Sequence, residues 1–574
     1  MIALVNPPNP PGRVSNKDMM GGFGQCYPAE CDVKVPPIDV PYIASVLRDS
    51  KVEFKVIDCL GSNLSLEELI QMLNGIELDF VFIRTSTPTF LWDSEVSRKL
   101  KEVIKAKIVF FGPHVNVTTD DVISNPNIDA IILGEPEYAI RDIAIQGFLD
   151  TPGIWYKEGG KTIKNEQQDY IEDLDALPFP AWDMLPYMEY TIGTLMPDVR
   201  PTLFLQTSRG CPFSCSYCPY PVAQGDRYRK RSAKNVIDEI AYLIRNFNVK
   251  NIVIRDAEFT LDRQRVEDIC AGLLKAGHNI SWRCETRVDT LDEALLDLMH
   301  KAGCTGINMG IESRSEKVCK SVGRKPLDVN DTKKIVKKCK ELGIHTFCFF
   351  IIGLPGDDVV TFLDTLNYAI DLKADISQFT VATPYLGTGM YEWAFNNNYI
   401  ETFDINKITG FEVMMRNENL SSEQIMLMRS QAQRLVDLIR SGSLMGAGEI
   451  LDEDRSPISF LMKYYFQKFY VKGIRRIVIY GTRGLSIPHV KKIGFEVIAV
   501  VDAKHEGKII DGMTVLNPEC IKFIKPEAIL LSPYKSSVSF KNIVDNETVI
   551  VEVFSGLKRI IIRMMRERHK KGLP

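Results

Sequence analysis

Short β-rich runs alternate with amphipathic helical stretches over the first 390 residues, and this alternation restricts the possible folds more than any other feature. In residues 1–150 the β-rich runs are MIALVNPP, FKVIDC, DFVFIRTSTPT, AKIVFFGPH and AIILGEPE. Between them, stretches such as LEELIQMLNGI and WDSEVSRKLKEVIK have helical periodicity. Alternating strands and helices form parallel sheets covered by helices. We therefore predict a Rossmann-like α/β domain over 1–150, with ligands beyond the carboxyl ends of its strands.

A second series of strand candidates follows an irregular, Pro-rich and acidic linker at 151–200. The candidates, within 201–395, are TLFLQTSRG, NIVIRDAEFT, ISWRCETRVD, GCTGINMGIES, HTFCFFIIGLPGD and ISQFTVATPYLGTG. Six strands with intervening helices predict a partial (β/α)6 barrel of the TIM type.

The remaining chain is expected to form two further parts. Residues 396–468 have a mainly helical pattern, and 469–574 resemble a small Rossmann-like α/β domain. In that domain one strand should end at Gly481 and the next at Asp502. Gly481 and Gly484 do not complete a G-x-G-x-x-G fingerprint, so nucleotide binding, substrate docking and oligomerisation all stay open.

Composition narrows the class of protein. At 574 residues the chain is too long for one hydrophobic core. Its 70 basic and 74 acidic residues argue against a nucleic-acid partner. We recognise neither a signal peptide nor a run of about 18 apolar residues that could span a membrane. Thirteen cysteines without the spacing of a disulfide framework fit a reducing compartment, so we expect a cytoplasmic protein.

Three cysteines, Cys211, Cys215 and Cys218, fall within eight positions of the stretch RGCPFSCSYCPYP. Closely spaced thiolates favour zinc or an iron–sulfur cluster over hard cations. A structural zinc site needs a fourth ligand, and the following PYPVAQGDRYRKRSAKN contains neither Cys nor His. We therefore predict a [4Fe–4S] cluster with one iron left open.

This CxxxCxxC motif, with the aromatic Tyr217 before its last cysteine, resembles that of the radical S-adenosylmethionine (SAM) superfamily. The resemblance implies that SAM chelates the open iron. One electron from a flavodoxin- or ferredoxin-type donor then cleaves SAM to a 5'-deoxyadenosyl radical. It places SAM contacts at the strand ends, although RDAEFT departs from the usual glycine–glutamate motif. The implied SAM-binding residues are Tyr217, Asp256, Glu258, Arg283, Glu285, Arg287, Glu312 and Gly353.

The N-terminal domain, together with LPFPAWDMLP, resembles the cobalamin-binding branch of that superfamily. The resemblance implies contacts to the corrinoid from Asn6, Pro7, Thr85, Ser86, Thr87, Gly112, Pro113, His114, Gly134 and Glu135. Proteins that ligate cobalt through histidine carry Asp-x-His-x-x-Gly, whereas here Gly112 and Val117 flank His114 at those positions. We therefore predict base-off cobalamin without a histidine ligand, and His114 as a pocket residue.

The resemblance favours a methyltransferase that acts on an unactivated carbon or a phosphinate of a small-molecule, lipid or peptide substrate. Its two SAM molecules would supply the methyl group, through cobalamin, and the radical. A radical cyclase or ring-rearranging enzyme, a non-catalytic corrinoid or redox sensor, and a methylthiotransferase are the alternatives. The last fits poorly, because Cys26, Cys31 and Cys59 are too closely spaced. No catalytic acid or base is identified.

The basic tail LKRIIIRMMRERHKKGLP could touch an anionic membrane or form a solvated helix.

Overall fold

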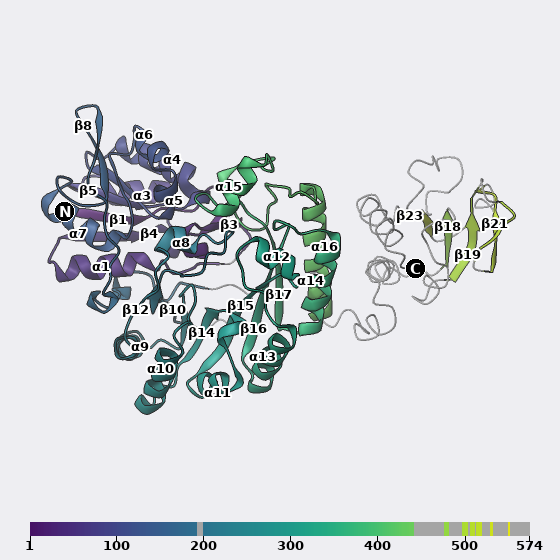
Figure 1. The fold of residues 1–574 in the computed structure, drawn as a ribbon. Helices are drawn as coiled ribbons and strands as arrows, with labels where there is room; N and C mark the ends of the chain where they lie inside the picture. Colours follow the sequence, from purple (N-terminus) through teal and green to yellow (C-terminus); the bar gives the residue numbers. More distant parts are fainter. Residues whose placement is uncertain are drawn as a thin grey trace. The chain divides into compact units, whose positions relative to one another are not determined.

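A computed structural model describes residues 1–31, 33–191 and 199–440, with six short stretches beyond them: 476–480, 496–502, 506–510, 512–518, 528–531 and 549–551. The chain divides into two compact units. One comprises residues 1–357 and 367–429, and the other residues 358–366 and 430–574. The first unit contains the N-terminal domain and the barrel, drawn in purple to green in Figure 1.

The N-terminal domain is built on a sheet with the strand order β4-β1-β5-β6-β7-β8-β9. Its first five strands pair in parallel, as the sequence predicts. The strands are β1 (Ile2–Asn6), β4 (Phe54–Asp58), β5 (Phe80–Arg84), β6 (Lys107–Phe111), β7 (Ala130–Ile132), β8 (Ile154–Glu158) and β9 (Lys161–Lys164). The helices are α1 (Asp39–Asp49), α2 (Cys59–Ser62), α3 (Leu66–Leu73), α4 (Phe90–Lys101), α5 (Pro113–Val117), α6 (Thr119–Ser124) and α7 (Pro136–Gln146).

Strands β8 and β9 extend this sheet into the stretch that the sequence assigned to an irregular linker. They form an antiparallel hairpin on β7, and Gly159 and Gly160 make its turn with φ of +56° and +76°. A Gly-Gly pair between two strands favours such a tight hairpin, because both turn residues need positive φ. The signal was present in the sequence, but the surrounding charged residues concealed it.

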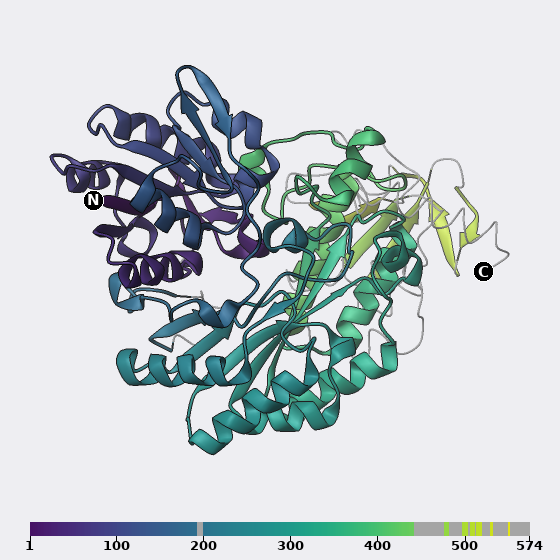
Figure 2. The same ribbon diagram turned by 60° about the vertical axis from the view of Figure 1, so that its left-hand side comes forward.

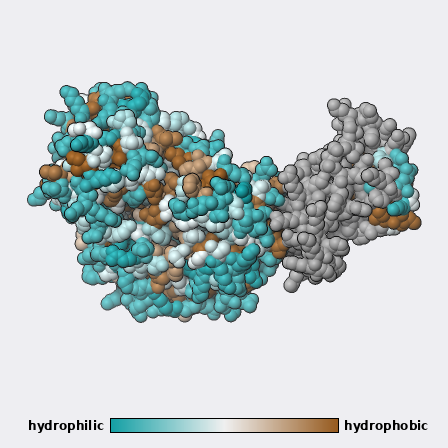
Figure 3. Space-filling view, turned by 45° about the horizontal axis from the view of Figure 1, so that its top comes forward, coloured by the Kyte–Doolittle hydropathy of each residue, from teal (hydrophilic) through white to brown (hydrophobic). Residues whose placement is uncertain are grey.

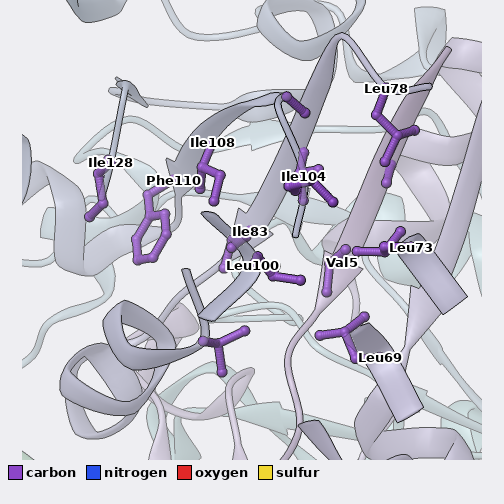
Figure 4. Close-up of a cluster of buried hydrophobic side chains, with 14 of the residues drawn as sticks. Val5, Leu69, Leu73, Leu78, Ile83, Leu100, Ile104, Ile108, Phe110 and Ile128 are labelled. Atoms are coloured by element: carbon purple, nitrogen blue, oxygen red, sulfur yellow. The ribbon is translucent and has the colours of Figure 1, made fainter. Parts of the chain in front are cut away.

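Helices on the sheet bury most of the central strands β1, β5, β6 and β7. Val5, Ile83, Ile108 and Phe110 from the strands pack against residues such as Leu69 of the neighbouring helices, all with no exposed surface (Figure 4). A sheet covered on both faces requires apolar side chains at successive positions, which explains runs such as KIVFF.

The barrel sheet contains the six predicted strands, in the order β10-β13-β14-β15-β16-β17, and they pair in parallel. They are β10 (Thr202–Leu205), β13 (Asn251–Ile254), β14 (Ser281–Thr286), β15 (Cys304–Glu312), β16 (His345–Ile352) and β17 (Ile376–Val381). The helices between them are α9 (Ala233–Phe247), α10 (Arg263–Ala276), α11 (Glu293–Lys301), α12 (Glu316–Ser321), α13 (Val329–Leu342) and α14 (Val359–Leu372). Helices α9, α10, α11 and α13 line one side of the sheet in Figures 1 and 2.

Two small antiparallel hairpins border the barrel and the N-terminal sheet. The first joins β2 (Arg13–Asn16) to β3 (Gln25–Pro28) through the 3-10 turn η1 (Met19–Gly22). The second pairs β11 (Ser208–Arg209) with β12 (Arg229–Lys230) around α8 (Tyr220–Gln224). Neither hairpin was predicted, because strands this short leave no recognisable hydrophobic period.

Residues 396–440 are less helical than predicted. Helix α15 (Gly389–Asn396) ends there, an irregular segment bridges Ile400 to Met415, and α16 (Ser422–Arg440) follows. The rest of the predicted helical segment, residues 441–468, lies outside the described residues. No helix in the described part of the chain could cross a membrane. On the face drawn in Figure 3, hydrophilic residues predominate at the rim of the first unit.

The C-terminal unit contains a mainly parallel sheet with the order β20-β21-β19-β18-β22-β23. Its strands are β18 (Arg476–Tyr480), β19 (Glu496–Val501), β20 (Ile509–Ile510), β21 (Met513–Leu516), β22 (Ala528–Leu531) and β23 (Val549–Val551). The first strand ends just before Gly481 and the second just before the buried Asp502, as expected. The basic tail, predicted to be a membrane contact or a solvated helix, lies outside the described residues.

Candidate active site

The three motif cysteines lie on the loop that connects β11 to α8. The backbone nitrogen of Cys211 donates to the carbonyl oxygen of Gly225 (3.1 Å), and that of Cys218 donates to Cys215 (3.0 Å). Gly210 precedes the motif with φ of +80°, and any Cβ there would overlap backbone atoms. The sequence RGC is therefore required for the turn that starts the loop.

The thiols lie in apolar surroundings that suit a metal cluster. Cys215 packs with the buried Val318, Val322, Leu354 and Met390. Burial raises the pKa of Cys211 and raises that of Cys218 to about 12. A bound metal must therefore stabilise the thiolates.

Three cysteines on one loop suit an iron–sulfur cluster. Among the described residues, no three Cys, His, Asp or Glu side chains converge where one metal ion could bind. A [4Fe–4S] cluster places each thiolate on a different iron, so it accepts thiols that do not meet at one point.

Glu258 lies just beyond β13 and is buried among hydroxyl groups. Its Oε1 accepts hydrogen bonds from Thr260 (3.3 Å), Thr286, Thr290 (3.2 Å) and the backbone nitrogen of Arg287 (3.1 Å). Burial raises the pKa of Glu258, and these hydrogen bonds oppose the rise. Since the bonds end on Oε1, the orientation of the carboxylate is fixed while Oε2 can bind a ligand.

Asp256, two residues earlier, is occupied within the protein. Its oxygens accept hydrogen bonds from the backbone nitrogen of Thr207 (2.6 Å), the Thr207 hydroxyl and the Ser208 hydroxyl (2.7 Å). Its side chain is fully buried. Asp256 thus positions the end of β10 and the start of the cysteine loop, and the geometry does not favour the SAM contact that the sequence suggested.

Glu312 ends β15 at an irregularity in the strand pairing and has φ of +64°, which is rare outside glycine. Its carboxylate lies 3.6 Å from the guanidinium of Arg324, which also donates to the Tyr217 hydroxyl (3.2 Å). Burial raises the pKa of Glu312 despite this partner. Glu312 and Tyr217, both predicted from the sequence as SAM contacts, are therefore brought together beside the cysteine loop.

The other predicted SAM residues lie around the same barrel mouth. Arg287 stacks over Phe213 of the cysteine loop at 4.3 Å from the ring centroid. Glu285 pairs with Arg255. The backbone nitrogen of Gly353 donates to Asp357 (2.9 Å).

Arg283 lies deeper than these residues, at the third position of β14 and two residues before Glu285.

A cavity of about 90 Å³ opens between the N-terminal domain and the barrel mouth. Of the predicted corrinoid residues, Gly112, Pro113, Gly134 and Glu135 line it. The barrel contributes Gln206, Arg209, Tyr220, Ala223, Gln224 and Arg255. Gly134 has φ of +87°, and a Cβ there would meet no protein atom within 4 Å, so a side chain would project into open space. This glycine wall fits a flat ligand that approaches the backbone closely.

The remaining predicted corrinoid residues do not line this cavity. Asn6 and Pro7 are buried at the end of β1, where Asn6 donates to Asp58 (2.7 Å). The hydroxyl of Thr85 donates to Asp93 (2.8 Å), and that of Ser86 bonds with Thr89. These polar side chains hold the backbone behind the cavity and have no free hydroxyl for a ligand.

His114 is a core residue and not the predicted pocket residue. Its ring nitrogens lie 3.2 Å from the Thr87 hydroxyl and 3.1 Å from the Thr118 hydroxyl, and its ring packs on Phe90. Burial lowers its pKa to about 4, so it is neutral near pH 7. The Gly-Pro-His sequence begins α5, which turns the side chain away from the strand end.

Buried ion pairs connect the cavity wall to the cysteine loop. Arg209, adjacent to Gly210, pairs with Glu135 (3.0 Å) and Glu137 (2.6 Å), and Arg229 pairs with Glu135 (2.8 Å). Burial alone would raise the pKa of Glu135, but the two arginines outweigh it and lower that pKa. The Glu135 carboxylate therefore joins the cavity wall to Arg209 and Arg229.

A second buried group in the same wall was not predicted from the sequence. Arg84 pairs with Asp18 (2.7 Å) and Asp39 (2.6 Å), and Arg255 donates to the backbone oxygen of Asp18 (3.2 Å). Burial raises the pKa of Asp18 to about 6, although Arg84 opposes the rise. Arg84 is the last residue of β5 and directly precedes Thr85. Its place at a strand end was the sequence feature that could have identified it as part of the cavity wall.

Two family models match the chain: "Radical SAM superfamily" over residues 205–369 and "B12 binding domain" over residues 25–144. An uncharacterized methyltransferase of Pyrococcus horikoshii is 32% identical over 401 residues, 68% of this chain and 85% of that protein. An anaerobic magnesium-protoporphyrin IX monomethyl ester cyclase of Cereibacter sphaeroides is 26% identical over 68% of this chain and 65% of its own length.

The fold is also that of a solved enzyme. The radical SAM methyltransferase TsrM of Kitasatospora setae, with cobalamin and a [4Fe–4S] cluster bound, has a TM-score of 0.54 and 18% identity. The match covers 69% of this chain and 74% of TsrM. A further TsrM structure holds its tryptophan substrate and a SAM analogue. The chain thus belongs to the B12-binding radical SAM enzymes, whose cofactors are a [4Fe–4S] cluster, SAM and cobalamin.

Proposed function

We propose that this enzyme methylates an unactivated carbon, or a phosphinate, of a small-molecule substrate. The observation that carries the proposal is the shared cavity. Its wall contains Gly112 and Gly134 of the B12-binding domain and Tyr220 of the cysteine-loop region. A corrinoid held there faces the barrel mouth where SAM binds. Methyl transfer requires these two cofactors and the substrate to meet at one place.

The chain's residues have separate tasks in this proposal. When bound, the cluster and SAM supply a 5'-deoxyadenosyl radical and the corrinoid supplies a methyl group. Cys211, Cys215 and Cys218 hold the cluster. Glu258, oriented through Oε1, and Glu312 bind polar groups of SAM at the strand ends, with Arg287 beside the cluster loop. A flavodoxin- or ferredoxin-type protein delivers the electron.

The lower face of cobalt is part of the same proposal. None of the described residues that line the cavity is a histidine. His114 has both ring nitrogens engaged by threonine hydroxyls and is held neutral by burial. These observations support base-off cobalamin without a histidine ligand.

The similarity to the cyclase favours a radical cyclase as the second candidate, and one assay separates the two. The reconstituted protein is incubated anaerobically with cobalamin, SAM and a strong reductant, and 5'-deoxyadenosine and S-adenosylhomocysteine are measured by mass spectrometry. Both products support the methyltransferase, because its two SAM molecules have different fates. Deoxyadenosine alone supports the cyclase. If a fully loaded protein forms neither, both proposals fail and a sensor is favoured.

A further inference from the structure

The inner face of the barrel is the side of β14–β17 turned away from the helices. On the outer face, Trp282 donates to the carbonyl oxygen of Ala302 after α11 (2.8 Å). The residues of β17 alternate between buried and half-buried. Since successive strand residues point to opposite faces, Arg283 and Glu285 lie on the inner face.

Arg283 has no acidic partner on this face. It is only 8% exposed, and its Nε is buried without a hydrogen-bond acceptor among the described residues. The guanidinium lies against Gly306 of β15, where an added Cβ would be 2.6 Å from Nη2 and 2.7 Å from Cζ. Its inner-face neighbour Glu285 is paired with Arg255 instead. A buried cation without a partner is costly, so its retention points to an anion that binds there.

A second unsatisfied polar group lies beside it. Asn308 is two residues beyond Gly306 on β15, and its Oδ1 is buried without a partner among the described residues. Asn308 pairs in register with Phe347 of β16, which stacks on Phe349 with ring centroids 4.7 Å apart. An unpaired cation, an amide and an aromatic pair thus share one surface, a combination typical of a small-molecule site.

The depth of Arg283 separates it from the SAM site. Arg283 precedes Arg287 by four residues, about 13 Å along a strand. Its guanidinium stays level with Gly306, six residues before Glu312. The residues proposed to bind SAM lie at the strand ends. The sequence-based expectation that Arg283 contacts SAM therefore does not agree with its position.

We propose that Arg283 binds an anionic group of the methyl acceptor, a carboxylate or a phosphate-type group. Asn308 is the second polar contact, and Phe347 and Phe349 contact an adjoining apolar part. The proposal rests on the proposed function and names its substrate class. Because the reacting carbon must lie near the barrel mouth, the anionic group is about 10 Å or more from the carbon that receives the methyl.

Ligand titration tests this without any methyl transfer. The cluster- and cobalamin-loaded protein is titrated calorimetrically with 4-phenylbutyrate, phenyl phosphate and the neutral 4-phenylbutyramide. We expect the wild type to bind at least one anion, Arg283→Met to bind it at least tenfold more weakly, and Arg283→Lys to lie between them. The amide should bind both proteins equally. The stronger of the two anions identifies the charged group of the substrate.

Two controls separate ligand binding from structural damage. Arg231 is also buried but pairs with Glu239 (2.5 Å), so Arg231→Met should lower the melting temperature while Arg283→Met should not. SAM affinity and uncoupled 5'-deoxyadenosine formation should stay unchanged in Arg283→Met. Equal anion binding by wild type and Arg283→Met, no anion binding by the wild type, or a loss of SAM affinity in the variant would each overturn the proposal. None of these results depends on whether methyl transfer occurs.

Discussion

At the cofactor cavity the buried Arg209 pairs with Glu135 and Glu137, whereas on the inner face of the barrel the buried Arg283 has no acidic partner among the described residues. Arg84 at the cavity is likewise paired with Asp18 and Asp39. Both regions bury arginine to a similar extent, so burial alone does not distinguish them. The difference lies in whether the protein itself neutralises the charge.

This difference indicates how each region binds its ligand. Where the charges are already neutralised, as in the cavity wall, a ligand would be held by shape, backbone groups and van der Waals contact, which suits the open space beside Gly134. Where a cation is left unpaired, the ligand must bring the opposite charge. The cofactor site is thus complete without its ligand, and the inner face is not.

The cysteine loop lies between the two regions, and breaking it should have the largest effect. Cys215→Ala, purified anaerobically, is expected to lose most of its iron and sulfide and all 5'-deoxyadenosine formation, because a thiolate ligand is missing. Cys284→Ala is the matched control, since Cys284 is buried on the outer face of β14. Iron and sulfide contents measure the outcome. Full iron in Cys215→Ala would contradict the cluster assignment.

Removing a paired arginine should destabilise the protein where removing an unpaired one does not. Arg209→Met leaves Glu137 buried without its cationic partner, while Glu135 keeps Arg229, and this should cost about 3–5 kcal/mol of unfolding free energy. Denaturant unfolding measures it. Arg98→Met, at a solvent-exposed ion pair, should change stability by less than about 1 kcal/mol. If Arg209→Met and Arg283→Met were equally stable, the distinction between the two regions would disappear.

Lowering the pH should destabilise the folded protein, because His114 behind the cavity takes up a proton more readily once the chain unfolds. Burial lowers its pKa from 6.5 to about 4, so the folded state binds its proton less readily than the unfolded state. The contribution of neutral His114 to the free energy of unfolding is complete above pH 6.5. It is lost as the pH falls toward 4, by roughly 3 kcal/mol in total. Unfolding free energies measured from pH 7 to 4 should fall more steeply for the wild type than for His114→Gln. Parallel curves would argue that His114 is accessible to solvent.

The smallest effect concerns the shape of the cavity. Gly134→Ala places a methyl group into open space within it and should weaken cobalamin binding about tenfold, or about 1.4 kcal/mol. Gly147→Ala is the matched control, because its φ of +84° equals that of Gly134 within a few degrees and its Cβ also meets no atom, but it does not line the cavity. Cobalamin titration by absorbance compares them. Equal affinities would show that the corrinoid does not approach Gly134.

The sequence predicted the elements better than the contacts. Eleven strands were placed correctly because parallel strands buried on both faces need continuous apolar runs, and those are visible without a partner. The expected ligand contacts of Thr85, Ser86, His114 and Asp256 stay predictions, because all four side chains are engaged by other protein groups. All four stand at or just beyond strand ends in the first unit, where a ligand contact is a reasonable prediction. Whether a polar side chain there faces the ligand or supports the loop depends on partners distant in sequence, such as Thr207 for Asp256 and Thr87 for His114.

By itself the sequence determined the two α/β domains of the first unit and the cofactors, and it predicted the cluster cysteines, because hydrophobic period and ligand spacing are local properties of the chain. Only the tertiary structure decided which charges are neutralised. Arg209 and Glu135 are 74 residues apart, and Glu285, two residues from the unpaired Arg283, pairs with Arg255 instead. Electrostatic pairing depends on distances in space, and these are set once the N-terminal domain and the barrel have packed together.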